Sequence, residues 1–302
     1  MSLPTPHLDK LKAALENEKL PANEKPRLQQ AIQKYNQWIA DISNIDNDSE
    51  SLIPDLIQLF NDYKFYIDYD LIFCSPNDFL YRQKGQLKLD NTVIEEFLPH
   101  LTSKKFPSLN NTIVFGPRKC FSAMYFKSTL NDTKKGGGVE IRTKDQDFAI
   151  AKKLFIRTSH NDTFTEYETK DAYLGYVTSE CKTNLDKTMF QEANATAHDV
   201  KTAIPGSKYF LLCEWLDMTP VSTAPTDIDE VLILRKAKRI SSNIRKNYST
   251  SAGRVANADS FKNYLESNPY DANVFTRFLN HIESMLNDED PEEGSVLTDG
   301  YF

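Results

Sequence analysis

The chain has few cysteines and histidines, and neither residue type is spaced as a metal site or a disulfide scaffold. Only four of its 302 residues are cysteine, and three of these lie in apolar runs. The five histidines form no zinc-binding pair. We therefore expect reduced, buried thiols and a cytoplasmic protein. The cysteines are Cys74, Cys120, Cys181 and Cys213.

Long hydrophobic runs and a secretory leader are also lacking. No apolar run is long enough to span a bilayer, and the segment from Met1 to His7 has no charged stretch followed by an apolar one. We expect no contact with a membrane. No internal repeat is present, and a chain of 302 residues has room for one large or two modest domains.

Positive charge is scarce, because 36 Lys and Arg residues face 43 Asp and Glu residues, for a net charge of −7. This balance excludes nucleic-acid binding over the whole surface, so any DNA contact requires a local basic patch. The stretch from Arg235 to Arg254 contains no acid and interleaves cations with small polar residues, a mixture suited to phosphates. A solvated basic helix face is the alternative. The cations expected to contact DNA are Arg235, Lys236, Lys238, Arg239, Arg245 and Lys246.

A second candidate for phosphate binding is the turn Lys134-Lys-Gly-Gly-Gly138, where three of the ten glycines follow two lysines. Glycine permits close approach of the backbone to a phosphate. A flexible hairpin turn is the favoured interpretation of this segment.

The residue pattern predicts a strand-rich centre between two helical regions. Apolar residues at helical spacing predict helices over Leu8–Glu16, Lys25–Ile45 and Leu52–Phe73, whose aromatic residues we expect to pack a core. The expected regions are residues 1–104, mainly helical, with DNA recognition or dimerisation as a further role; 105–225, the strand-rich core; 226–286, helical with the basic patch; and 287–302, an acidic mobile tail.

Glu180 and Lys182 end a run with strand propensity that begins at Leu174, and a helical pattern opens directly after them. Side chains alternate along a strand, so these two point the same way while Cys181 points into the sheet. The pattern Glu-x-Lys is weak by itself. Glu168-Thr-Lys170 repeats it in a polar stretch that is typical of a loop, and a solvated ion pair on a sheet face is equally compatible.

A second carboxylate beside Glu180 would make this pair a metal-dependent nuclease site. Asp171 is near in sequence, but nine extended residues separate it from Glu180 by about 30 Å. Phe148 to Arg157 is a second strand-like run, and an antiparallel hairpin through a loop at 158–172 would bring its start beside the end of the Glu180 strand. Asp147 is then the expected partner and Asp145 the fallback. Alternatively, Asp147 only belongs to a turn at 144–147 between two strands.

The surrounding pattern completes an α+β core. Residues 138–143 read as a further strand, Asp186 to Lys201 as a helix, and Lys208 to Met218 as an apolar strand. Strand, helix and strand in this order imply a crossover to a parallel neighbour. The predicted order is a three-strand antiparallel meander, a crossover helix and a fourth strand in a mixed sheet.

These residues resemble the PD-(D/E)xK nuclease superfamily, with Asp147, Glu180 and Lys182 in the signature positions and Gln146 in place of the usual proline. The stretches from Glu180 to Glu192 and from Leu212 to Met218 are similar to those of type II restriction endonucleases of the BbvCI and DdeI kind, which cut CTNAG-like sites.

The resemblance implies a bacterial enzyme that cleaves double-stranded DNA with Mg²⁺ and leaves 5′-phosphates. The implied metal ligands are Asp147, Glu180 and the backbone carbonyl of Cys181, and Lys182 would orient the attacking water. Gln191 matches a glutamine that lies near the scissile phosphate in many such nucleases, although a plain polar helix residue is the alternative. The resemblance also implies a homologous second subunit, or a second copy, as partner.

Two other functions fit the same residues. A repair or structure-specific nuclease would share the site without reading a base sequence. A non-catalytic DNA-binding or assembly subunit would keep the fold without the chemistry, and the intact Asp147, Glu180 and Lys182 speak against it.

Overall fold

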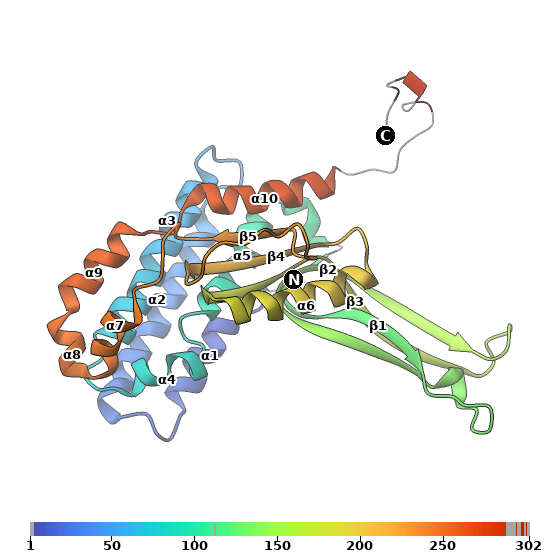
Figure 1. The fold of residues 1–302 in the computed structure, drawn as a ribbon, viewed down its shortest axis with the longest axis horizontal. Helices are drawn as coiled ribbons and strands as arrows, with labels where there is room; N and C mark the ends of the chain where they lie inside the picture. Colours follow the sequence, from blue (N-terminus) through green and yellow to red (C-terminus); the bar gives the residue numbers. More distant parts are fainter. Residues whose placement is uncertain (1–2, 112, 288–293, 295–296, 299, 301–302) are drawn as a thin grey trace.

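A mixed five-stranded sheet runs through the middle of the molecule in the order β1-β2-β3-β4-β5. The computed structural model describes residues 3–111, 113–287, 294, 297–298 and 300 (Figure 1). β1 to β3 pair as an antiparallel meander, and β4 and β5 add in parallel. The strands are β1 Val114–Phe126, β2 Val139–Ser159, β3 Tyr167–Leu185, β4 Lys208–Leu216 and β5 Glu230–Ile233.

The α+β class and the crossover expected from the sequence are confirmed. β3 is followed by α6 (Lys187–Ala203), and β4 then pairs with β3 in parallel, with Glu180 beside Leu211. α6 begins sharply because the side chain of Asp186 accepts a hydrogen bond from the Met189 N–H at 2.9 Å, which satisfies a free amide of the first turn.

The expected first strand and turn of the meander are wrong. Residues 139–143 and 148–157 belong to one strand, β2, and the first strand of the meander is β1, which the sequence pattern did not reveal. The expected turn at 144–147 is extended because β1 pairs along it, with Lys144 opposite Cys120 and Asp145 opposite Lys119. Ladder hydrogen bonds here outweigh the turn propensity of the Lys-Asp-Gln-Asp segment. The expected loop at 158–172 is also shorter, since β2 runs to Ser159 and β3 starts at Tyr167.

The helices of the N-terminal and C-terminal parts of the chain pack beside the sheet. The three expected N-terminal helices are present as α1, α2 and α3, the last of which continues as a π-helical segment. The described N-terminal elements are α1 Pro6–Leu15, η1 Ala22–Glu24, α2 Lys25–Asn44, α3 Leu52–Phe65, η2 Tyr66–Phe73, α4 Phe79–Leu87, α5 Thr92–Lys105 and η3 Pro107–Asn111. The short helix η4, Lys135–Gly138, lies between β1 and β2. The helices that follow β5 are α7 Ser242–Arg245, η5 Lys246–Ser249, α8 Ser251–Ala256, α9 Ala258–Ser267 and α10 Ala272–Leu286. Within the described residues, no helix has the length and apolar character needed to cross a membrane.

Two hydrophobic clusters cover the two faces of the sheet. One joins the N-terminal helices to α10, where Phe278 packs against Phe210 and Phe148 of the sheet. The other lies under α6 and includes Ala193 and Tyr209. The expected acidic tail falls largely outside the described residues.

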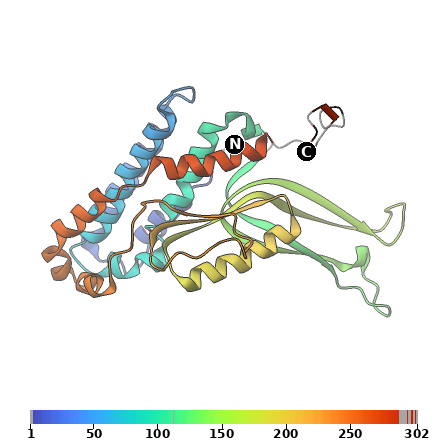
Figure 2. The ribbon, with the colours of Figure 1, turned by 45° about the horizontal axis from the view of Figure 1, so that its top comes forward.

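The far parts of β1, β2 and β3 project from the body as an arm, which both ribbon views show (Figures 1 and 2). We define the arm as residues 121–143 and 152–172. It includes η4 and the loop between β2 and β3. The strands that carry the candidate site therefore continue without a break into the arm.

The N-terminus of α1 is anchored by a buried carboxylate of α5. Glu96 is fully buried, and its Oε2 accepts the backbone N–H groups of His7, at 2.7 Å, and Leu8, at 3.3 Å. Tyr35 donates its hydroxyl to the other oxygen. Burial raises the pKa of Glu96 from 4.5 to about 7, although these hydrogen bonds oppose the shift.

We expect Glu96→Gln to remove a pH-dependent loss of stability. Between pH 4.5 and about 7 the folded protein keeps a proton that the unfolded chain has released. The wild-type protein therefore loses stability as pH rises through this window, by up to about 3 kcal/mol for this group. Denaturant titrations measure the free energy of unfolding of both proteins. The value for the variant minus that for wild type should rise as pH increases from 4.5 to about 7. A difference that stays constant with pH would contradict the raised pKa of Glu96.

Candidate active site

The register of β2 and β3 sets Asp147 beside Glu180. Phe148 pairs with Ser179 at the end of the antiparallel ladder, and Asp147 and Glu180 are the next residues of the two strands. The Cys181 N–H donates to Asp147 Oδ2 at 2.9 Å. Phe148 and Ser179 project from one face of the sheet, so the next residue of each strand, Asp147 and Glu180, projects from the other, and the two carboxylates share that face.

The other candidate acids lie apart from this point. Asp171 is opposite Phe155 in the arm, and its carboxylate pairs with Lys153 at 2.9 Å. Asp145 is exposed opposite Lys119. Of the three acids weighed from the sequence, the structure brings Asp147 next to the Glu180 segment.

Lys182 and Glu180 form an ion pair on this face, with Nζ 3.2 Å from Oε1. Burial lowers the pKa of Lys182, but the charges of Glu180 and Asp147 outweigh it and leave the pKa above its usual value. Lys182 is therefore a cation at neutral pH. The second oxygen of the pair, Glu180 Oε2, is buried without a hydrogen-bond partner among the described residues.

Asn91 and Glu95, at the start of α5, complete the surroundings of the site and were not anticipated from the sequence. The Asn91 side-chain amide donates to the Cys181 carbonyl at 3.1 Å and to Glu95 Oε1 at 2.9 Å. The sequence signal for Glu95 was its place among the apolar residues Val93, Ile94 and Phe97, where a solvated acid is not expected.

The electrostatics of Glu95 confirm that it lies near the carboxylates. Burial raises its pKa from 4.5 to about 7, and the charge of Asp147 raises it further than the charge of Lys88 lowers it. Near neutral pH, Glu95 can therefore carry or release a proton beside Asp147, which is behaviour typical of a functional site.

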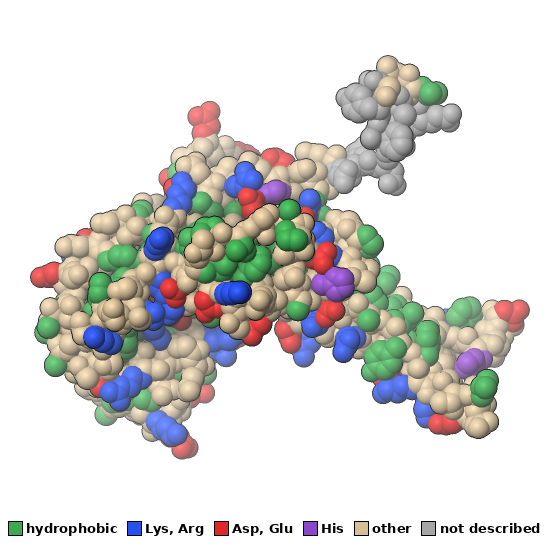
Figure 3. All heavy atoms as spheres, viewed as in Figure 1, with side chains coloured by type: hydrophobic (Ala, Val, Ile, Leu, Met, Phe, Trp, Pro, Cys, Tyr) green, Lys and Arg blue, Asp and Glu red, His purple; other side chains and the backbone are tan. Residues whose placement is uncertain are grey.

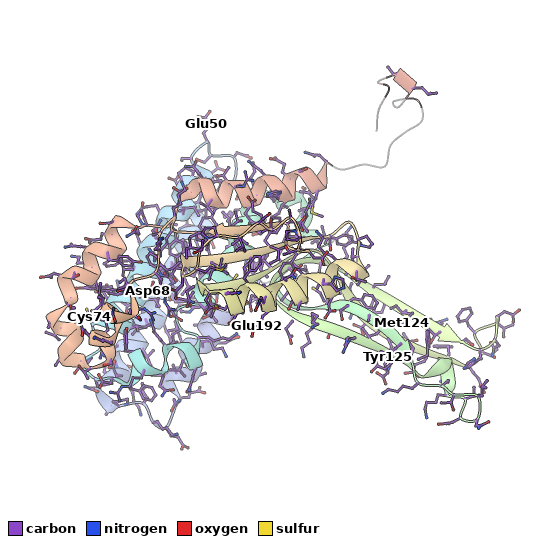
Figure 4. The ribbon with its side chains drawn as sticks, in the orientation of Figure 1. Glu50, Asp68, Cys74, Met124, Tyr125 and Glu192 are labelled. Carbon is purple, nitrogen blue, oxygen red and sulfur yellow. The ribbon has the colours of Figure 1, made fainter. Side chains whose placement is uncertain are left out.

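Gln191 is the remaining side chain that the sequence placed at the site, and it lies on α6. Gln191 is exposed on α6, and its neighbour Glu192, labelled in Figure 4, contributes negative charge at Lys182. His198 pairs with Asp227 at 2.8 Å, and Glu140 pairs with Lys127 at 2.9 Å in the arm.

Arg235, expected to contact DNA, is buried. It is 5% exposed, with Nε 2.9 Å from Glu214 and its guanidinium stacked on the rings of Trp215 and Tyr270. The carboxylates of Glu214 and Asp68 require this cation, because a buried charge needs a partner. Arg235 is thus excluded from a phosphate-binding surface.

The other cations of the basic stretch lie nearer to solvent. Lys238 and Lys246 are exposed, whereas Lys236 pairs with Asp271 at 2.7 Å and Arg239 with Asp217 at 2.8 Å. Arg245 Nε donates to the Ile240 carbonyl.

Part of this stretch lines a cavity of about 350 Å³. Arg239 and Arg245 line it together with Thr183, which follows Lys182, and Asp90, which precedes Asn91. The side chains of Asp147, Glu180 and Lys182 are not among those that line it, and Thr183 projects from the face of β3 opposite to Glu180 and Lys182.

The residues present fit a hard divalent cation. In the part of the chain that the structure describes, no three His, Cys, Asp or Glu side chains are gathered as a ready metal site. However, two carboxylates share the face, one of them with an unsatisfied buried oxygen. Mg²⁺ is commonly held by one or two carboxylates together with waters, so this donor set is sufficient.

Comparison with known proteins identifies the family and the fold. One solved structure, described as the native BbvCI A2B2 tetramer at low resolution, contains a similar chain, with a TM-score of 0.57 and 19% sequence identity over 89% of this chain and 100% of that one. No curated protein sequence matches. The model of the Bpu10I restriction endonuclease family matches residues 86–302, a span that includes the site, and confirms the resemblance drawn from the motif. The chain is a member of the Bpu10I restriction endonuclease family.

Proposed function

We propose that this restriction endonuclease chain is a subunit that hydrolyses one strand of double-stranded DNA at a specific short site, with Mg²⁺ bound at Asp147 and Glu180. The observation that carries the proposal is the meeting of two carboxylates and a lysine on adjacent strands, through the bonds Asp147–Cys181 and Glu180–Lys182. The short site is expected to be CTNAG-like, by the resemblance of the motif.

Asp147 and Glu180 would hold the metal, with waters filling the other positions. When bound, Mg²⁺ lowers the pKa of a coordinated water and offsets charge on the phosphoryl oxygens. The Cys181 carbonyl was expected as a further ligand, and its oxygen accepts the Asn91 amide here. Asn91 therefore positions the peptide that links the two catalytic side chains.

Lys182 supplies positive charge rather than a base. Its raised pKa keeps it protonated, so it donates hydrogen bonds to the attacking water and to the phosphoryl oxygens. Charge that grows on those oxygens is stabilised by a cation already in place. Gln191 would lie toward the scissile phosphate from α6. Cleavage would leave a 5′-phosphate and a 3′-hydroxyl.

DNA binding by an acidic chain requires a local basic surface, and the cavity lined by part of the basic stretch supplies one. Arg239 and Arg245 line it, and Lys236, Lys238 and Lys246 belong to the same segment. We assign phosphate contacts to these five cations.

Two active sites are needed to cut both strands, because one site attacks one phosphate. The similar BbvCI chain belongs to an A2B2 assembly. We infer that this chain works with a homologous, unlike partner subunit that cuts the second strand. A repair nuclease would need no such partner, and the family match favours restriction.

We expect Glu180→Ala and Lys182→Ala each to abolish Mg²⁺-dependent cleavage of plasmid DNA, while gel-shift binding stays within a few-fold of wild type. The matched control is Glu168→Ala with Lys170→Ala, a second Glu-x-Lys pair on the same strand with an ion-pair distance of 3.6 Å. Control protein should cut normally. Cleavage at the wild-type rate by either site variant would reject the assignment.

Asn91→Ala should lower the cleavage rate about 10- to 100-fold, as is usual for groups that orient ligands. The Asn91 amide donates hydrogen bonds to the Cys181 carbonyl and to Glu95. It makes no direct hydrogen bond to Asp147 or Glu180, so its effect on the metal would be indirect. Single-turnover cleavage across Mg²⁺ concentrations gives the measurement, with exposed Asn243→Ala as the control. An unchanged rate would show that the Cys181 peptide needs no such support.

The partner inference predicts strand-specific nicking. With an intact partner subunit present, Lys182→Ala protein should nick one fixed strand of the target and form almost no linear product. Strand-specific end labelling identifies the cut strand. Efficient double-strand cleavage by the wild-type chain alone would reject the unlike partner and indicate a pair of identical chains.

A further inference from the structure

The arm carries an excess of cations in an otherwise acidic protein. Its residues include eight Lys and Arg against six Asp and Glu, whereas the whole chain has a net charge of −7. Four of the eight cations are neutralised by acids of the arm, through the pairs Lys127–Glu140, Lys134–Asp132, Lys153–Asp171 and Lys170–Glu168. Within the described chain, the other four form no ion pair, and these are Lys135, Arg142, Lys152 and Arg157.

Two of these unpaired cations meet at one tyrosine near the tip. Tyr167 is 37% exposed, and the Arg157 guanidinium lies 4.1 Å from the centre of its ring. Lys135 Nζ lies 5.7 Å from the same centre. Lysine and arginine side chains held by one ring have lost much of their rotational freedom, so they form a pre-ordered cationic cluster.

The glycine turn after Lys135 is built to hold this cluster. Thr158 Oγ1 donates to the Gly136 carbonyl at 2.8 Å, and Gly136 has the left-handed φ of +56°. A Cβ at Gly136 would lie 2.5 Å from the Glu168 Cβ. The turn is therefore docked on β2 and β3 rather than a free hairpin loop, and only glycine fits there.

Along β2, the cluster lies within about one helical turn of duplex DNA from the candidate site. Arg157 and Asp147 are on the same strand, β2, ten residues apart, which corresponds to at most about 34 Å. One helical turn of B-DNA is about 34 Å long. A duplex whose scissile phosphate lies at Asp147 and whose axis follows the arm therefore presents the phosphates of its next turn to Lys135 and Arg157.

We propose that the arm is a second DNA-binding element, in which Lys135 and Arg157, ordered on Tyr167, bind backbone phosphates about one helical turn from the cleaved bond. This rests on the proposed function for the identity of the ligand. Lys and Arg side chains interleave with hydrophobic ones along the arm in Figure 3. The exposed apolar side chains of the arm, Met124 and Tyr125 among them (Figure 4), make a docked protein chain the competing outcome.

The test compares two arm variants by binding in metal-free buffer. Lys135→Glu with Arg157→Glu removes the cationic cluster, and Leu130→Ser with Phe155→Ser removes exposed apolar surface, since these two side chains are 102% and 69% exposed. The probes are random-sequence duplexes of about one and about three helical turns. The readout is the slope of log Kd against log salt concentration for each probe.

For wild type, the slope should be steeper on the long duplex than on the short one. The charge variant should lose about two units of slope on the long duplex, since each phosphate contact contributes about 0.9. The apolar variant should keep the wild-type slope. An unchanged slope in the charge variant overturns the proposal, as does an apolar variant that loses the slope equally.

Sedimentation of both variants separates the competing role. If the charge variant keeps its DNA slope while either variant loses association with other protein chains, the arm is a protein contact and the proposal fails. Plasmid cleavage by wild type is scored separately. A chain that binds through the arm but does not cut would reject the proposed function and leave this inference standing.

Discussion

The hydrogen bond from the Cys181 N–H to the Asp147 carboxylate is the contact on which the candidate site depends. The ladder between β2 and β3 ends at the pair Phe148 and Ser179, so beyond Ser179 this edge of β3 has no backbone partner on β2. Backbone groups there must still be satisfied. Asp147 and Asn91 take the N–H and the carbonyl of Cys181, so two side chains replace a strand at the point where the sheet opens.

The use of side chains in place of a neighbouring strand at Cys181 explains how the site concentrates negative charge. Asp147, Glu180 and Glu95 come from three different elements, and burial together with the charge of Asp147 raises the pKa of Glu95. Lys182 offsets part of this charge, and the buried, unsatisfied Glu180 oxygen leaves the remainder for a cation. An excess of negative charge at one point of the sheet is typical of a functional site.

The sequence predicted the parts of this arrangement that depend on local periodicity. The Glu180 strand, α6 and β4 follow from strand alternation, a helix cap and an apolar run, and hairpin geometry was enough to choose Asp147 over Asp171. β1 was missed because Gly116, Pro117 and several polar residues interrupt its apolar pattern. Glu95 was out of reach because no local signal tells which strand a helix residue will face.

Charge patterning was the least informative signal, for a physical reason. Arg235 looked like a surface cation because its partners, Asp68 and Glu214, are distant in sequence. Arg254 is likewise buried, and it donates to the Phe73 carbonyl at 2.9 Å. A run of cations reveals total charge but not burial, so tertiary pairing decides which members reach solvent.

The continuity of β2 from Asp147 into the arm limits how this protein can vary during evolution. Because side chains alternate with a period of two, inserting a single residue between Asp147 and Arg157 would move every later side chain of that strand to the opposite face. Such a change is tolerated only if a bulge absorbs it, as β3 already does at Tyr176, opposite Ile150 and Ala151. Residues inserted in the loop between β2 and β3 do not change which face each side chain of the two strands occupies. Related chains are thus free to differ in arm length at the tip, while the spacing at its base stays fixed.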